Sequence, residues 1–187
     1  MRMMFVWALI LVGSLTGCGE SGKPEGAVSY EREPFATFQN FVGNWDVTKH
    51  PVLFAVVRTP GEYDQIFYPA GAMGVTRPYA PEPEFFNGRQ ILTVCRCLNE
   101  LDEKDFAVES IQEVGDELFY RYRFRGQDLG AKGSFKMEFS VYIPRKKYSR
   151  VHFIENGKPL QVLDLKSGQW AVPPAHPSWQ EQMKQGR

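Results

Sequence analysis

The sequence is poor in the residues that most often perform chemistry, with three histidines and three cysteines among 187 residues. His50, His152 and His176 are widely spaced, and two of them adjoin prolines. The chain has neither a Gly-x-Ser-x-Gly nucleophile elbow nor a His-Glu-x-x-His metal-binding helix. We therefore expect a non-enzymatic protein that uses no cofactor and no metal.

The chain also lacks an excess of one charge and an apolar run long enough to span a membrane. The 22 basic residues balance the 22 acidic ones, which gives no support for a nucleic-acid partner. The apolar stretch Phe5 to Val12 is too short, because a membrane helix needs about 20 residues to cross roughly 30 Å of hydrocarbon.

The N-terminus has the layout of a secretory signal. A basic start is followed by the apolar stretch and then by small residues, which predicts a signal peptide over residues 1–17. Leu15-Thr16-Gly17-Cys18 resembles the lipobox of bacterial lipoproteins. The resemblance implies that Cys18 carries a diacylglycerol, which supplies the two acyl chains that stable anchoring requires. Gly19, in place of Asp, implies sorting to the periplasmic face of the outer membrane.

Composition divides the remaining chain into three parts. Residues 18–29 are polar and glycine-rich, as in a flexible tether. Residues 30–172 carry the strand signals of one β domain. Residues 173–187 form a proline-rich tail, in which Ser178-Trp179-Gln180-Glu181 fits a capping box and predicts a short helix.

Alternating apolar and polar residues predict an all-β fold. The alternation is clearest over 118–124 and 135–143, where every second residue is apolar. Further strands are expected over 45–48, 52–57, 65–68, 90–98, 106–111, 151–154 and 160–165, with a hairpin turn at Asn156-Gly157. Pro78 to Gly88 reads as a long loop. Short strands joined by tight turns predict a single antiparallel β-barrel or a sandwich.

Gly43 and Trp45 form a Gly-x-Trp motif at the start of the strand series. The motif resembles the opening of lipocalin and related calycin barrels, where the Trp plugs the closed end. The resemblance implies a cup for a small apolar ligand. The inward residues of the alternating strands would line it: Tyr120, Tyr122, Phe124, Met137 and Phe139. The related small barrels of periplasmic protease inhibitors imply a protein partner instead.

Cys95 and Cys97 are two residues apart in a predicted strand. Their Cα atoms would lie about 6.5–7 Å apart, at the upper limit for a disulfide. Three interpretations remain: a strained disulfide, two buried thiols that act as small hydrophobes, or a redox or soft-metal pair.

A third group of residues is basic. Arg121, Arg123 and Arg125 share one face of a strand, and Arg145-Lys146-Lys147 and Arg150 follow. Together they would form a surface for lipid phosphates or an acidic protein. The alternative is the solvated outer face of a sheet.

These observations predict an outer-membrane lipoprotein that acts as a binding module for a small apolar ligand or lipid, attached to the membrane through its N-terminal lipid. The alternative is a protein-interaction lipoprotein, such as a periplasmic inhibitor, an immunity or exclusion protein, or a subunit of an envelope assembly. A second alternative is a redox or copper-handling protein based on Cys95 and Cys97.

Overall fold

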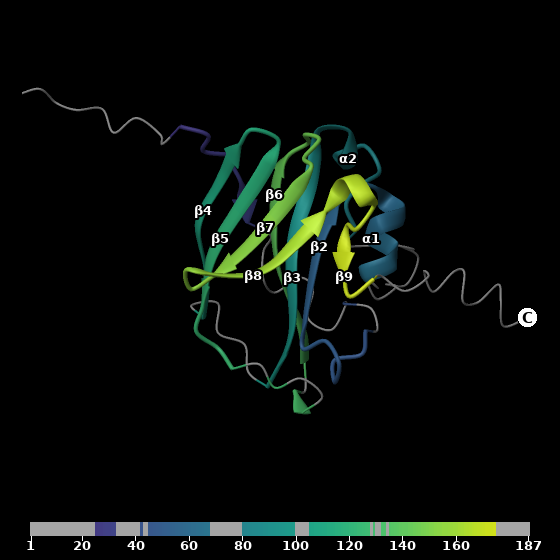
Figure 1. The fold of residues 1–187 in the computed structure, drawn as a ribbon. Helices are drawn as coiled ribbons and strands as arrows, with labels where there is room; N and C mark the ends of the chain where they lie inside the picture. The colour runs from purple at the N-terminus through teal and green to yellow at the C-terminus, as the bar shows by residue number, and fades with distance from the viewer. Residues whose placement is uncertain are drawn as a thin grey trace, which may run out of the picture.

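The computed structural model describes residues 25–32, 42, 45–67, 80–99, 105–127, 129, 132–133 and 135–174. Within these residues two β-sheets face each other (Figure 1). The five-stranded sheet has the order β1 (Glu31–Arg32), β6 (Phe135–Pro144), β3 (Arg89–Leu98), β2 (Val52–Val57), β9 (Ala171–Val172). The four-stranded sheet has the order β4 (Phe106–Val114), β5 (Glu117–Phe124), β7 (Arg150–Glu155), β8 (Lys158–Asp164).

The all-β prediction is confirmed, and of its two alternatives the sandwich is the observed one. The described strands do not close into a barrel, because each sheet ends on strands that pair on one side only. These edge strands are β1 and β9 in one sheet and β4 and β8 in the other. The barrel alternative is therefore wrong.

The sequence predicted antiparallel pairing throughout, but one pair of strands is parallel. β5 and β7 are paired in parallel, from Glu117 opposite Arg150 to Tyr122 opposite Glu155. The reason is the path of the chain between them: it leaves the four-stranded sheet after β5, forms β6 in the other sheet, and returns beside β5. Parallel neighbours need such a crossover, which here is a strand instead of the usual helix.

The core between the sheets is built from the alternating residues that the sequence places on one face. Tyr120, Tyr122, Phe124, Met137 and Phe139 all lie in it, and each is at most 5% exposed. The Phe139 ring stacks on Phe106 with centroids 4.4 Å apart, and the Tyr120 and Tyr122 rings are 5.2 Å apart. None of these five residues lines a described cavity. The predicted ligand-lining set is corrected to packed core, because these side chains fill the space between the sheets themselves.

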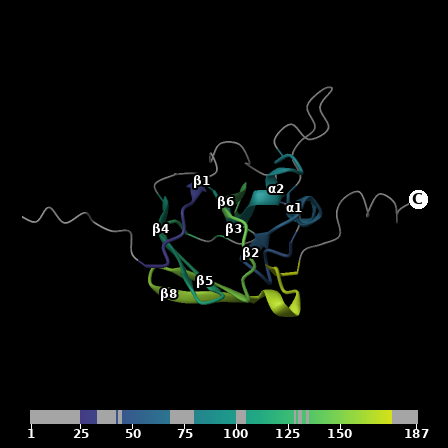
Figure 2. The ribbon, with the colours of Figure 1, turned by 90° about the horizontal axis from the view of Figure 1, so that it is seen from above.

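A second apolar cluster covers the outer face of the five-stranded sheet. Helices α1 (Pro60–Ile66) and α2 (Phe85–Gly88) lie on this face, on the side away from β5 and β8 (Figure 2). Because both faces of β3 are covered, nine of its ten residues are buried, and the strand appears in the sequence as a nearly continuous apolar run.

Two predicted strands are wrong. Residues 45–48 belong to a turn region, and 65–66 end helix α1.

Several predictions fall outside the described residues: the signal peptide, Cys18, Gly43 and the helix of the tail. In the part of the chain that the structure describes, no helix is long and apolar enough to cross a membrane.

Candidate functional site

A cleft of about 510 Å³ opens at the upper end of the sandwich in Figure 1, where several connections meet. Five parts of the chain line it: the end of β2 with the start of α1, the start of β3, the β4–β5 turn, the β6–β7 connection, and the 3₁₀ helix η4 (Leu165–Ser167). Its volume lies within the range typical of small-molecule sites.

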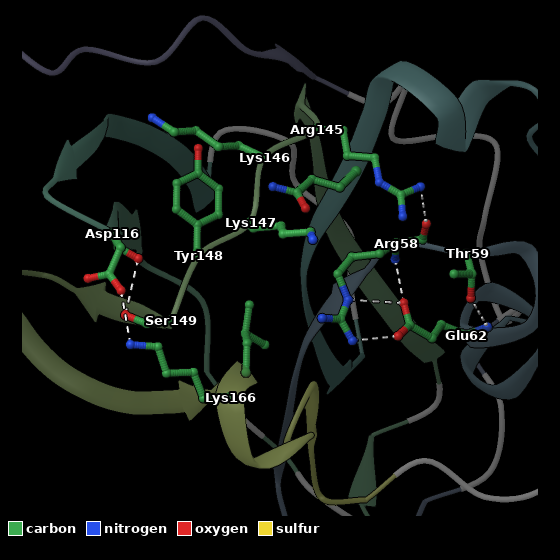
Figure 3. Close-up of a pocket in the computed structure, with 12 residues that line it drawn as sticks. Arg58, Thr59, Glu62, Asp116, Arg145, Lys146, Lys147, Tyr148, Ser149 and Lys166 are labelled. Carbon is green, nitrogen blue, oxygen red and sulfur yellow. Dashed lines mark hydrogen bonds and ion pairs between the residues drawn. The ribbon is translucent and has the colours of Figure 1, made fainter.

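Cations dominate the lining of this cleft (Figure 3). Five basic residues face two carboxylates, Glu62 and Asp116, which leaves a net charge of +3. The basic residues are Arg58, Arg145, Lys146, Lys147 and Lys166. Counting Glu113, which binds Lys146 from outside the lining, reduces the local charge to +2. The chain as a whole has no net charge, so the positive charge is a local property of the cleft.

The start of helix α1 fixes Arg58 at one wall. Thr59 caps the helix by accepting a hydrogen bond from the Glu62 backbone N–H at 3.1 Å, and Pro60 occupies the first turn. The Glu62 carboxylate in turn accepts from the Arg58 backbone N–H at 2.6 Å and from its guanidinium at 2.7 Å. The capping arrangement therefore also orients a cation toward the cleft.

Arg145 is held on the same wall by backbone oxygens. Its guanidinium donates to the carbonyl of Arg58 at 3.1 Å and to that of Phe86. The backbone N–H of Arg145 donates to the Gly88 carbonyl at 2.9 Å. No carboxylate in the described part of the chain pairs with Arg145, so its charge is available to a bound anion.

Lys147 is the most available cation of the cleft. It is exposed and has neither an ion pair nor a hydrogen bond with the residues that the structure describes. Figure 3 shows its side chain extending into the cleft toward Arg58. Because Glu62 already neutralises Arg58, Lys147 adds an unpaired positive charge beside that ion pair, and this charge attracts an anion into the cleft.

The opposite wall is organised by two ion pairs. Lys146 binds Glu113, whose carboxylate also accepts from the Tyr148 hydroxyl. Burial alone would raise the pKa of Glu113, but the hydrogen bonds from Lys146 and Tyr148 outweigh it and lower that pKa. Lys166 lies 3.1 Å from Asp116, and its hydrogen bond is the main cause of the lowered pKa of that carboxyl. Both acids are therefore ionised at neutral pH.

Gln90, at the start of β3, is a buried polar residue in the lining of the cleft. The residue is 0% exposed and lines the cleft, yet neither the amide nitrogen nor the amide oxygen has a hydrogen-bond partner. An unpaired buried amide costs about 1–3 kcal/mol, so native proteins rarely keep one without a reason. The amide offers both a donor and an acceptor to a molecule in the cleft.

The predicted basic surface is divided by the structure. Arg121 and Arg123 lie on the outer face of the four-stranded sheet, and Arg121 donates to Gln112 at 3.2 Å. Arg150 pairs with Glu117 at 3.4 Å. Only the segment 145–147 reaches the cleft. Arg58, Lys166 and Gln90 were not predicted, and no local sequence signal connects them to this site.

The remaining predicted residues have structural positions. In the structure Cys95 and Cys97 are free and buried. Burial raises the pKa of both thiols. The described residues hold no group of three or more His, Cys, Asp or Glu side chains arranged to bind a metal. Trp45 packs outside the intersheet core, donates to the His50 carbonyl at 2.7 Å, and lies under Lys136.

Fold and site together define an all-β sandwich with a basic cleft at one end. No family of proteins, no curated protein and no solved structure matches the chain.

Proposed function

We propose that this protein is a lipid-anchored, non-enzymatic binding module of the bacterial envelope that takes an anionic ligand in the basic cleft. The single observation that carries the proposal is the composition of that cleft: five cations and an unpaired buried amide around a cavity of about 510 Å³.

The charge of the cleft favours a ligand of charge −2, because the local sum over lining residues and Glu113 is +2. Inorganic phosphate and phosphate monoesters approach this charge near neutral pH, phosphodiesters carry a charge of −1, and the oxygens of all three accept several charge-assisted hydrogen bonds at once. Arg145 and Lys147 supply donors that no described carboxylate occupies, and Gln90 supplies a neutral donor. An apolar ligand receives less support, because the intersheet space that would hold it is filled by side chains.

The anion site is tested with the mature chain, residues 18–187, carrying Cys18→Ser so that no lipid is attached. We expect inorganic phosphate at low salt to raise the thermal midpoint and to give a saturable isothermal titration. A ligand at 100 times its Kd stabilises the folded state by about 2.7 kcal/mol. Raising the salt should weaken the binding, because charge attraction carries it.

Two variants locate the binding. Lys147→Gln and Gln90→Leu should each weaken phosphate binding about 5- to 10-fold, in line with the loss of one charge-assisted or one neutral hydrogen bond. Lys158→Gln, at the far end of the molecule, is the matched control. Equal losses in all three variants, or no phosphate binding by the parent chain, would refute the site.

The lipid anchor is tested separately in bacteria grown with labelled palmitate. The chain should incorporate the label, and Cys18→Ser should abolish it, while Cys97→Ser keeps it. Label that persists without Cys18 would overturn this part of the proposal.

A further inference from the structure

The N-terminal segment joins the sandwich directly beside the basic cleft. Ala27 forms an isolated bridge with Gln112, and the Glu113 backbone N–H donates to the Gly26 carbonyl at 2.8 Å. Figure 1 shows this segment entering at the upper end, where β4 turns into β5.

The joint is specific to glycine. Gly26 has φ +78°, and a Cβ atom there would lie 2.4 Å from the Glu113 carbonyl oxygen. Only glycine fits so close to another backbone with a positive φ. The place where the tether meets the domain is therefore fixed by the sequence.

Glu113 connects this joint to the cleft. Its backbone holds Gly26, while its carboxylate binds Lys146 and Tyr148, both of which line the cleft. The tether and the basic wall of the cleft are consequently both held by Glu113, and they lie at the same end of the molecule.

We infer that this end faces the membrane and that the cleft takes the headgroup phosphates of anionic phospholipids. The inference rests on the proposed function, because it uses both the lipid at Cys18 and the anion site. Cys18 and Glu25 are seven positions apart in the sequence. At 3.3–3.6 Å per residue they span at most about 25 Å, so the domain stays close to the bilayer.

The exposed charges of this end suit an anionic surface. The side chains of Lys146, Lys166 and Arg89 are 53%, 73% and 50% exposed, and Lys147 is exposed as well. Among the exposed acids at this end, Asp116 and Glu31 are held in ion pairs with Lys166 and Arg89. Glu25, Glu82 and Glu84 are exposed there as well, so the attraction to an anionic surface comes from the cleft cations and not from the net charge of this end. Each cation at an anionic membrane surface strengthens binding about fivefold.

A phospholipid headgroup also matches the interior of the cleft. Its phosphate suits Arg145 and Lys147, and the hydroxyl groups of phosphatidylglycerol suit the unpaired amide of Gln90. A lipid bound in this way would be a second attachment to the membrane, at the end of the domain where the tether joins it.

The test is co-sedimentation of the mature Cys18→Ser chain with vesicles of phosphatidylcholine, with and without phosphatidylglycerol. We expect binding to the vesicles that contain phosphatidylglycerol, released by high salt. Lys147→Gln combined with Lys166→Gln should weaken this binding at least about fivefold. Arg125→Gln combined with Lys158→Gln removes the same charge from the opposite end and should leave binding unchanged.

A second measurement does not depend on weakened binding. Cys95 and Cys97 are buried and Cys18 is replaced by Ser, so a polarity-sensitive dye can be attached at Lys147→Cys or at Lys158→Cys. Phosphatidylglycerol vesicles should shift the emission of the dye at position 147 and leave the dye at position 158 unchanged.

The outcomes separate the two proposals. Equal binding to both kinds of vesicle, equal losses in the two double variants, or equal dye shifts would overturn the membrane-facing inference. If inorganic phosphate still binds in a Lys147-dependent manner, the proposed anion site survives that result. If neither vesicles nor phosphate bind, both proposals fail.

Discussion

Two buried polar residues of β3, Arg96 and Gln90, have different surroundings. Arg96 is 1% exposed, ion-paired with Glu155, and stacked over the Phe124 ring at 4.2 Å. Gln90 is equally buried, but its amide has no partner. Arg96 is held by Glu155 and Phe124 and lines none of the described cavities, whereas the Gln90 amide lines the basic cleft. Its place in the cleft is what makes Gln90 a candidate for ligand binding.

Glu113 gives a pH-dependent prediction at the residue scale. Its pKa in the folded protein is lowered, so its contribution to stability is present above the ordinary value of about 4.5 and is lost as the pH falls through the lower folded value. Glu113→Gln should therefore reduce the free energy of unfolding by about 1–2 kcal/mol at pH 7. Urea unfolding at a series of pH values measures this difference.

The difference in the free energy of unfolding between the parent chain and Glu113→Gln should shrink as the pH falls below 4.5. A constant difference down to pH 3 would contradict the role of the ionised carboxylate. Glu109→Gln, on the same strand, serves as the control and should show no pH-dependent difference.

The two thiols give a second prediction at this scale. Cys95 and Cys97 are 0% and 5% exposed, and burial raises the pKa of both, so little reactive thiolate forms in the native protein. Native protein exposed to iodoacetamide at pH 8 should remain unmodified at both residues. After unfolding in denaturant without a reductant, mass spectrometry should find both alkylated; an unmodified pair would mean a disulfide.

At the scale of elements, the strands with strict alternation were predictable and the helices were missed. Strands β5 and β6 follow directly from every second residue being apolar. Helix α1 was read partly as a strand, because Ile66 and Phe67 are apolar neighbours. Its start signal was nevertheless in the sequence: Thr59-Pro60-Gly61-Glu62 combines a cap, a first-turn proline and a Glu three residues after the cap.

The sheet pairings were less predictable than the strands. Two-residue strands such as β1 and β9 have no recognisable local pattern. The parallel β5–β7 pair depends on where β6 goes, which the local sequence of either strand does not encode. A hairpin turn, in contrast, is local: Asn156 and Gly157 have φ of 50° and 76°, as the Asn-Gly signal predicts.

Asn156 gives the prediction at this scale. Its side-chain amide donates to the Phe124 carbonyl at 2.8 Å and its oxygen accepts from the Phe124 backbone N–H at 3.1 Å, which joins the hairpin to the end of β5. Asn156→Ala removes both bonds and should destabilise the protein by about 1–3 kcal/mol, as measured by denaturant unfolding. Gln161→Ala, which removes an exposed bond within β8, should cost less than half as much.

At the scale of the whole molecule, the candidate site was not predictable from the sequence. Its lining residues extend from Arg58 to Lys166 and come from five separate parts of the chain. Only the run Arg145-Lys146-Lys147 was visible as a basic segment. The cleft exists because the two sheets bring these connections to one end, and long-range sheet pairing is the part of the fold that local patterns do not determine.

The two sheets should unfold together. The chain forms β1, β2 and β3 in one sheet, β4 and β5 in the other, and then changes sheet for β6, β7 and β9. Neither sheet is a continuous segment, and both contribute side chains to the core between them. We expect tryptophan fluorescence, which in the mature chain reports on Trp45, Trp170 and Trp179, and far-ultraviolet circular dichroism to give the same urea midpoint. Midpoints that differ clearly would show that the sheets separate.

The alternation of strands between sheets also affects how the chain acquires its structure as it is delivered. A chain that emerges N-terminus first, from a ribosome or a translocation channel, has no complete sheet until its last strands appear. The four-stranded sheet is complete only when β8, which ends at Asp164, has emerged. The five-stranded sheet is complete only when β9, which ends at Val172, has emerged. Most of the sequence must therefore leave the ribosome or channel before either sheet is complete. Until then the emerging chain stays unfolded enough to pass through a translocation channel.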